Sequence, residues 1–88
     1  MAKKIIFSDH ALARMEERSI SKRLALGAVI IPDKIEKSLK NDNRFLFKKI
    51  YFNKKAKSEH LLILVAEIFL EKIEIITIID TSKIGKHF

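Results

Sequence analysis

The chain has 88 residues, 48% of them hydrophobic, which is enough for one compact domain over residues 1–88 but not for a second core. Eighteen basic residues against eleven acidic ones give a net charge of +7, which favours a polyanionic partner, although solvated lysine-rich surfaces are equally common. The absence of cysteine excludes disulfides and a cysteine nucleophile, and three scattered histidines predict neither a metal site nor another cofactor.

The chain begins with a predicted strand and a predicted helix. Residues 5–7 form a short β-branched and aromatic run, which is typical of a strand. Ser8 or Asp9 is a good N-cap, because its side-chain oxygen can accept a hydrogen bond from the first turn of a helix. Strong helix formers follow without glycine or proline, so we expect this helix to end near Arg18.

A second helix and a weaker strand follow. Ser21 can cap a helix over residues 22–31, and Pro32 ends it because the residue before a proline is pushed out of the α region. The two helices are therefore expected to form a short αα-hairpin. Residues 34–39 contain enough branched side chains for a strand, and residues 41–43 are turn-forming.

Three longer strands complete the predicted fold. Residues 44–52 form the first of them, and residues 53–58 form a basic polar loop. Residues 60–70 and 73–80 are nearly continuous apolar runs, which are typical of strands buried on both faces. The order predicts an α+β fold, β-α-α-β-β-β-β, with the two N-terminal helices packed on one face of a mainly antiparallel sheet. The opposite face is then a candidate binding surface.

One row of side chains distinguishes the first helix from a helix built only for packing. At 100° per residue, His10, Arg14 and Arg18 fall within roughly 80° of one another, beside the apolar stripe of the helix. Packing alone does not need one imidazole and two guanidinium groups in line. We therefore interpret this row as an edge that faces an anion.

The same row belongs to a longer pattern that resembles a known family. The pattern consists of Ser8-Asp9-His10-Ala11, Arg14-Met15, Arg18 followed by Ile20-Ser21, a second helix ending at Ile31-Pro32-Asp33, and strands with Val65-Ala66-Glu67 and Ile76-Thr77-Ile78. It resembles the family catalogued as domain of unknown function 4258, from about residue 5 to residue 80.

The resemblance implies a fold similar to the RelE/ParE toxins and to the wider group of barnase-like and colicin-type ribonucleases. Members of the family are suspected metal-independent ribonucleases or toxin components, often paired with an antitoxin. The implied partners are RNA, free or on the ribosome, and a cognate acidic antitoxin protein. The chain departs from well-characterised RelE-like ribonucleases because it lacks their strong C-terminal motif with a catalytic Tyr or His.

Metal-independent RNA cleavage needs a base for the 2′-hydroxyl, an acid for the leaving 5′-oxygen and cations for the charge on the phosphate. His10 is the best acid/base candidate, because imidazole titrates near neutrality. Arg14 and Arg18 can hold a phosphate through forked, charge-assisted hydrogen bonds. The alternatives are that His10 only caps its helix and that the arginines pair with carboxylates such as Glu17.

Two polar residues within the apolar strands complete the candidate catalytic set. Glu67 lies among apolar neighbours, where a carboxylate is costly unless it is paired. It can orient His10 or pair with an arginine of the first helix, or it can lie at an exposed strand end. Thr77 is the other candidate catalytic residue, although its simplest role is that of a β-former.

A basic hairpin supplies the candidate nucleic-acid contacts. Its lysines lie between and near aromatic side chains, a pattern suited to RNA backbone contact and base stacking. Lysines on an edge strand also block aggregation and need no ligand for that role. The histidine after the basic loop can be a second proton carrier or a solvated loop-end residue. The candidate contacts are Lys48, Lys49, Tyr51, Lys54, Lys55, Lys57 and His60.

The resemblance implies a small toxin-like domain of a toxin–antitoxin system, and together with the patterns above it leads us to expect an RNA-binding domain that is a suspected metal-independent ribonuclease. One alternative is a non-catalytic ParE-like domain that acts by protein or nucleic-acid binding, and another is an inactive domain that receives a partner helix. The N-terminus lacks the apolar run of a signal peptide, and the apolar stretches are shorter than a bilayer requires. We therefore expect a soluble cytoplasmic protein that does not contact a membrane.

Overall fold

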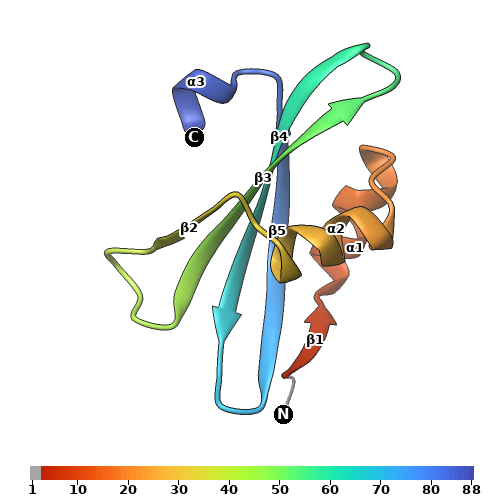
Figure 1. Cartoon of the computed structure of the whole chain (residues 1–88). Coiled ribbons are helices and arrows are strands. Elements are labelled where there is room, and N and C mark those ends of the chain that lie inside the picture. The colour runs from red at the N-terminus through yellow and green to blue at the C-terminus, as the bar shows by residue number, and fades with distance from the viewer. Residues whose placement is uncertain (1–2) are drawn as a thin grey trace.

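The computed structural model describes residues 3–88 and has an α+β fold (Figure 1). The predicted order of a strand, two helices and four strands is confirmed, and a short helix near the end of the chain, α3, was not predicted. Within residues 3–88, no helix has the length and apolar character needed to cross a membrane. The elements are β1 (Lys4–Phe7), α1 (Asp9–Glu17), α2 (Lys22–Ile30), β2 (Lys34–Lys37), β3 (Arg44–Asn53), β4 (Ser58–Ile68), β5 (Lys72–Thr81) and α3 (Ile84–His87).

The five strands form one mixed sheet in the order β1-β5-β4-β3-β2. The strands from β2 to β5 pair as an antiparallel meander, as predicted. β1 lies parallel to β5 at one edge of the sheet, so the first and the last strand of the chain are neighbours. This pairing places α1, which follows β1 directly, beside β5.

The main core lies between the sheet and the two longer helices. α1 contributes side chains four residues apart, which share one face of a helix, and β4 contributes alternate residues, which share one face of a strand. The predicted packing of both helices on one face of the sheet is therefore confirmed. The buried side chains of this core are Ala11, Met15, Ile20, Ala25, Ala28, Val29, Phe47, Leu62, Leu64, Ala66, Ile75 and Ile78.

A one-residue bulge interrupts the regular pairing of β5 with β4. Val65 of β4 lies opposite Thr77. The next residue of β4, Ala66, lies opposite Ile75, so Ile76 is the extra residue. Because the bulge shifts the alternation of side chains by one, odd-numbered residues of β5 face the helices before it and even-numbered residues face them after it.

The bulge also anchors the start of α1. The main-chain oxygen of Ile76 accepts a 2.7 Å hydrogen bond from the Ser8 hydroxyl. The same hydroxyl oxygen accepts a 3.0 Å hydrogen bond from the amide of Ala11 in the first turn of α1. Of the two predicted capping residues, Ser8 is therefore the N-cap, and its hydroxyl joins the helix to the sheet.

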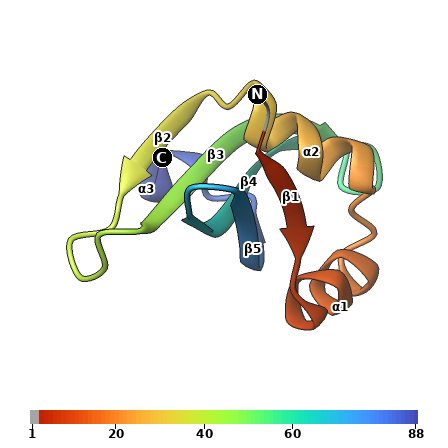
Figure 2. The same cartoon turned by 90° about the horizontal axis from the view of Figure 1, so that it is seen from below.

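The face of the sheet opposite α1 and α2 was expected to be an uncovered binding surface, but α3 and the C-terminal residue Phe88, together called the tail, cover part of it (Figures 1 and 2). Lys48 of β3 lies on this face and is only 5% exposed. Its ammonium group donates hydrogen bonds to the main-chain oxygens of His87 at 2.6 Å and Phe88 at 3.3 Å, and to the carboxylate of Glu36. The hydrogen bond from Lys48 lowers the pKa of Glu36. Lys48 therefore fastens the tail to the sheet.

The double role of the Ser8 hydroxyl can be tested by mutation. We expect Ser8→Ala to lower the free energy of unfolding by about 1–3 kcal/mol, because it removes both a capping bond and a part-buried bond to the sheet. Ser21→Ala is the matched control, since the hydroxyl of Ser21 caps α2 by accepting from the Leu24 amide at 3.1 Å. That variant should lose only about 1 kcal/mol in the same urea titration. Equal losses would contradict a contribution from the bond to Ile76.

Candidate functional site

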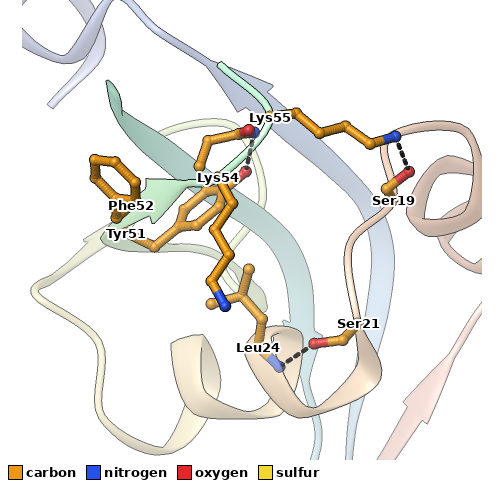
Figure 3. Close-up of a pocket in the computed structure, with 8 residues that line it drawn as sticks. Ser19, Ser21, Leu24, Tyr51, Phe52, Lys54 and Lys55 are labelled. Atoms are coloured by element: carbon orange, nitrogen blue, oxygen red, sulfur yellow. Dashed lines mark hydrogen bonds between the residues drawn. The ribbon is translucent and has the colours of Figure 1, made fainter. Parts of the chain in front are cut away.

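A groove opens between the turn that joins α1 to α2 and the hairpin that joins β3 to β4 (Figure 3). It encloses about 390 Å³. The side chain of Lys54 runs toward Leu24 of α2, and Lys55 reaches across to the other turn, where its ammonium donates a 3.2 Å hydrogen bond to the Ser19 hydroxyl. We call this site the hairpin groove. Its lining residues are Ser19, Ser21, Leu24, Tyr51, Phe52, Asn53, Lys54 and Lys55.

The turn between the helices is held by main-chain hydrogen bonds. The amide of Ile20 donates to Met15 at 2.8 Å, and the amide of Ser19 donates to Glu16 at 3.2 Å, the pair of bonds that defines a Schellman motif. Ile20 is 6% exposed and so anchors the turn in the core. This motif requires a left-handed residue directly after the C-cap of the helix, which is Arg18, and that residue is Ser19.

Both turns that border the hairpin groove contain a left-handed residue that is not glycine. Ser19 in the first turn and Lys57 in the hairpin each have a φ of 55°. This conformation costs an L-residue roughly 1 kcal/mol or more relative to glycine. The two glycines of the chain, Gly27 and Gly85, have no positive φ and lie in helices. The two turns that border the groove therefore carry backbone strain at Ser19 and Lys57 that a glycine at either position would remove.

Four polar side chains from three strands meet on the helix-facing side of the sheet, beside the hairpin groove. The Tyr51 hydroxyl donates a 2.8 Å hydrogen bond to Asp80 and accepts one of 3.2 Å from the Asn53 amide. His60 Nδ1 lies 3.2 Å from one carboxylate oxygen of Asp80 and 3.3 Å from the other. The rings of Tyr51 and His60 meet edge to face, with centroids 6.1 Å apart. We call Tyr51, Asn53, His60 and Asp80 the polar cluster.

The Asp80 carboxylate fixes the tautomer of His60. An ionised carboxylate only accepts hydrogen bonds, so the nitrogen that faces it, Nδ1, carries the proton. In the neutral imidazole, Nε2 is then the acceptor. Nε2 makes no hydrogen bond within residues 3–88. In that part of the chain, the side-chain nitrogens that are both fully buried and without a partner are Arg14 Nε and Arg44 Nε, so Nε2 is not fully buried. Nε2 therefore reaches solvent, although only 14% of the His60 side chain is exposed.

The environment of the polar cluster keeps Tyr51 protonated. Burial, and then the hydrogen bond to the Asp80 carboxylate, raise the pKa of Tyr51 to about 12. The phenol is therefore a hydrogen-bond donor to Asp80 at every pH near neutrality. The Asp80 side chain is only 7% exposed, so its hydrogen-bond partners are Tyr51 and His60 rather than bulk water.

The row of residues predicted on α1 lies outside the hairpin groove. His10 and Arg18 are exposed, and Arg14 is partly exposed. Arg14 forms a long ion pair of 3.9 Å with Glu17, which is the helix-surface pairing considered as the alternative from the sequence. None of the three residues of the row lines the groove. An anion site along α1 stays a prediction.

Glu67 and Thr77 lie on the other face of the sheet, the one that carries α3. The carboxylate of Glu67 accepts hydrogen bonds from Arg44 at 2.9 Å and Asn41 at 3.3 Å, so its partner is a strand arginine and not a residue of α1. Thr77 lies opposite Val65, directly after the bulge. The structure therefore does not bring the five predicted catalytic residues into one site.

The predicted basic contacts divide into lysines that hold the fold and lysines that face solvent. Lys48 is the buried residue that fastens the tail, and its assignment to an exposed basic surface is corrected. The ammonium of Lys49 donates a 2.9 Å hydrogen bond to the main-chain oxygen of Ile31 at the end of α2. The exposed lysines of the predicted set are those of the hairpin turn: Lys54, Lys55 and Lys57.

Sequence reasoning places Tyr51 and His60 in the candidate set but misses two members of the polar cluster, Asn53 and Asp80. Asn53 is expected in a basic loop, whereas it pairs with Ser58 and ends β3. Asp80 ends an apolar run, much as Glu67 interrupts one, and a carboxylate in such a run is the signal that could have identified it. Its face cannot be deduced, because regular alternation without the bulge places Asp80 on the wrong side of the sheet.

Within residues 3–88, no group of three or more His, Cys, Asp or Glu side chains is arranged to hold a metal ion. Comparison of the chain with protein-family models, with curated proteins and with solved structures finds no match. Inference about function therefore starts from the hairpin groove and the polar cluster.

The raised pKa of Tyr51 can be measured directly, because Tyr51 is the only tyrosine and the chain has no tryptophan. We expect absorbance at 295 nm to titrate with a midpoint of about 12 in the folded protein and near the ordinary value of 10.0 in urea. Because the folded-state pKa is the higher one, the stabilising effect of Tyr51 is fully present below pH 10 and is lost as the pH rises toward 12.

Asp80→Asn supplies the matched variant for this titration. Removing the carboxylate charge while keeping the shape of the side chain should move the midpoint of Tyr51 downward, with the part caused by burial retained. A native midpoint at 10, or one that Asp80→Asn leaves in place, would contradict the hydrogen-bonded arrangement of the polar cluster.

Proposed function

We propose that the chain is an RNA-binding domain of the RelE/ParE toxin type that cuts RNA without a metal ion. The observation that carries the proposal is the position of the polar cluster beside a groove bordered by exposed lysines. The resemblance of the α1 pattern to the family of domain of unknown function 4258 supports the toxin-like assignment. A five-stranded sheet with two N-terminal helices on one face agrees with that assignment.

The chemistry of the hairpin favours RNA among polyanions. Its three exposed lysines lie on one turn, where they can follow a phosphate backbone. Phe52, next to them, is 59% exposed and offers a ring on which an unpaired base can stack. A groove between two turns suits a single strand whose bases are splayed, whereas a duplex needs a broader surface.

A non-catalytic domain that acts by protein contact is the second candidate function. Ile30 and Ile31 at the end of α2 are 67% and 69% exposed, and Ile35 on the edge strand β2 is 52% exposed. Exposed apolar side chains beside an unpaired strand edge are typical of protein-binding surfaces. An antitoxin is the partner that the sequence resemblance implies for such a surface.

RNA binding is tested by neutralising the hairpin lysines. We expect the triple variant Lys54→Gln, Lys55→Gln and Lys57→Gln to weaken binding of a labelled single-stranded RNA of mixed sequence, measured by fluorescence anisotropy in EDTA. Each lysine that neutralises one phosphate contributes about 0.7 to the slope of log K against log salt, so the slope should fall by about 2.

A control triple of Lys37→Gln, Lys40→Gln and Lys86→Gln removes the same charge from exposed positions outside the groove. It should change the RNA affinity and the salt slope far less. Equal losses of RNA affinity in the two triple variants would show that binding depends on the net charge of the protein and not on the hairpin groove. A larger loss in Arg14→Gln with Arg18→Gln would move the RNA site to α1, and the absence of RNA affinity would favour the protein-binding alternative.

A further inference from the structure

We propose that His60, held by Asp80 and in contact with the groove residue Tyr51, is the general base for cleavage of RNA bound in the hairpin groove, and that Asp80 and Tyr51 are its positioning residues. This inference rests on the proposed function, because it names the groups that act on the RNA bound there. It assigns to His60 the proton-transfer role for which the sequence favoured His10.

The geometry of the pair suits a base. Asp80 accepts a hydrogen bond from the Nδ1–H of His60, so the lone pair of the imidazole is on Nε2, the nitrogen that reaches solvent. The remaining 86% of the His60 side chain is buried, so the ring is held in one orientation. A base held in place by a carboxylate avoids the loss of rate that follows from a misplaced group.

The burial of Asp80 is the feature that packing alone does not explain. Its side chain is 93% buried in a sheet whose neighbouring positions are filled by Leu62 and Ile78. Burying a carboxylate costs free energy that an apolar side chain of similar volume would not cost. The other residues of β5 that face the helices are isoleucines, so the role that explains a carboxylate at this position is to orient the imidazole of His60.

Tyr51 connects this pair to the hairpin groove. It lines the groove, and its ring meets His60 edge to face at 6.1 Å. Its hydroxyl remains protonated and is committed to Asp80 at 2.8 Å, so Tyr51 positions the carboxylate and is not itself a base. Because Lys54 runs toward Leu24 of α2, a phosphate that it holds would lie on the helix-facing side of the sheet, the face that also carries His60.

His10 lacks these features. It is exposed in the first turn of α1, and within residues 3–88 no carboxylate is hydrogen-bonded to its ring. Neither histidine lines the groove, but the ring of His60 meets the lining residue Tyr51 edge to face at 6.1 Å. Of the two histidines proposed for proton transfer, His60 is the one whose orientation is fixed.

The proposed reaction is the transfer of the phosphoryl group from the 5′-oxygen to the neighbouring 2′-oxygen. His60 Nε2 takes the proton of the 2′-hydroxyl while the bond from O2′ to phosphorus forms. The bond from phosphorus to O5′ breaks with its electron pair on oxygen, which takes a proton from the Lys54 ammonium. The products are a 2′,3′-cyclic phosphate and a free 5′-hydroxyl, and His60 and Lys54 exchange their protons with solvent.

The test is cleavage of labelled single-stranded RNA in EDTA by the full chain and by matched histidine variants. His60→Asn keeps a donor toward Asp80 and removes the Nε2 base, so the first-order rate at saturating RNA should fall by about 100-fold or more with RNA affinity retained. Asp80→Asn should lower that rate by about 100-fold through misorientation. His87→Asn, the same change at an exposed histidine outside the groove, should leave the rate unchanged.

Two further measurements separate a chemical role from a structural one. Added imidazole should restore cleavage by His60→Ala, whereas a neutral salt at equal ionic strength should not. RNA with sulfur in place of the bridging 5′-oxygen needs no acid for its leaving group. That substrate should rescue Lys54→Gln but not His60→Asn, because only His60 acts on the 2′-hydroxyl.

The outcomes distinguish this proposal from the proposed function on which it rests. RNA binding without cleavage by the wild-type chain would overturn the catalytic role and leave an RNA-binding domain. Cleavage that survives His60→Asn and is lost in His10→Asn would return the role to α1. Rescue of His60→Asn by the sulfur-containing substrate would overturn its assignment as the base. If His60→Asn fails to fold, as judged by circular dichroism, the cleavage rate of Asp80→Asn tests the pair instead, and an unchanged rate would overturn the proposal.

Discussion

One extra residue in β5 determines which side chains meet at the candidate site. The bulge at Ile76 shifts the alternation of the strand, so Asp80 faces α1 and α2 rather than α3. Without that shift, the carboxylate would lie across the sheet from the other members of the polar cluster. Ile76 also supplies the main-chain oxygen that accepts the hydrogen bond from the Ser8 hydroxyl. A single bulge in the sheet thus fixes both the position where α1 begins and the presence of Asp80 in the polar cluster.

The lysines of this chain differ in whether they are free to contact a partner. Lys48 and Lys49 are consecutive in β3 and therefore point to opposite faces, and each is used to hold main-chain oxygens of a neighbouring segment. The lysines of the hairpin turn instead remain exposed at the groove. The lysines that contribute to the net charge of +7 thus include some that fasten the fold together and others that are free to meet a polyanion.

The elements were predictable because local signals mark them. Serine caps, Pro32 and the apolar runs were enough to predict the order of the elements and the antiparallel meander. The predicted ends of the elements differ from the observed ones by a few residues; β2, for example, was predicted over 34–39 and is found at Lys34–Lys37. Contacts between elements were not predictable in the same way. Helical periodicity aligned His10, Arg14 and Arg18 but could not say what that edge faces, and alternation put Lys48 on a face that an unpredicted helix covers.

The placement of glycine in this chain has a consequence for heat tolerance. Gly27 lies inside α2, where an added methyl group would meet nothing within 4 Å, although alanine is the better helix former. Ser19 and Lys57 occupy the conformation for which glycine is suited. An engineer could therefore raise the melting temperature with Gly27→Ala, at a position that does not line the hairpin groove, and leave the strained turns unchanged.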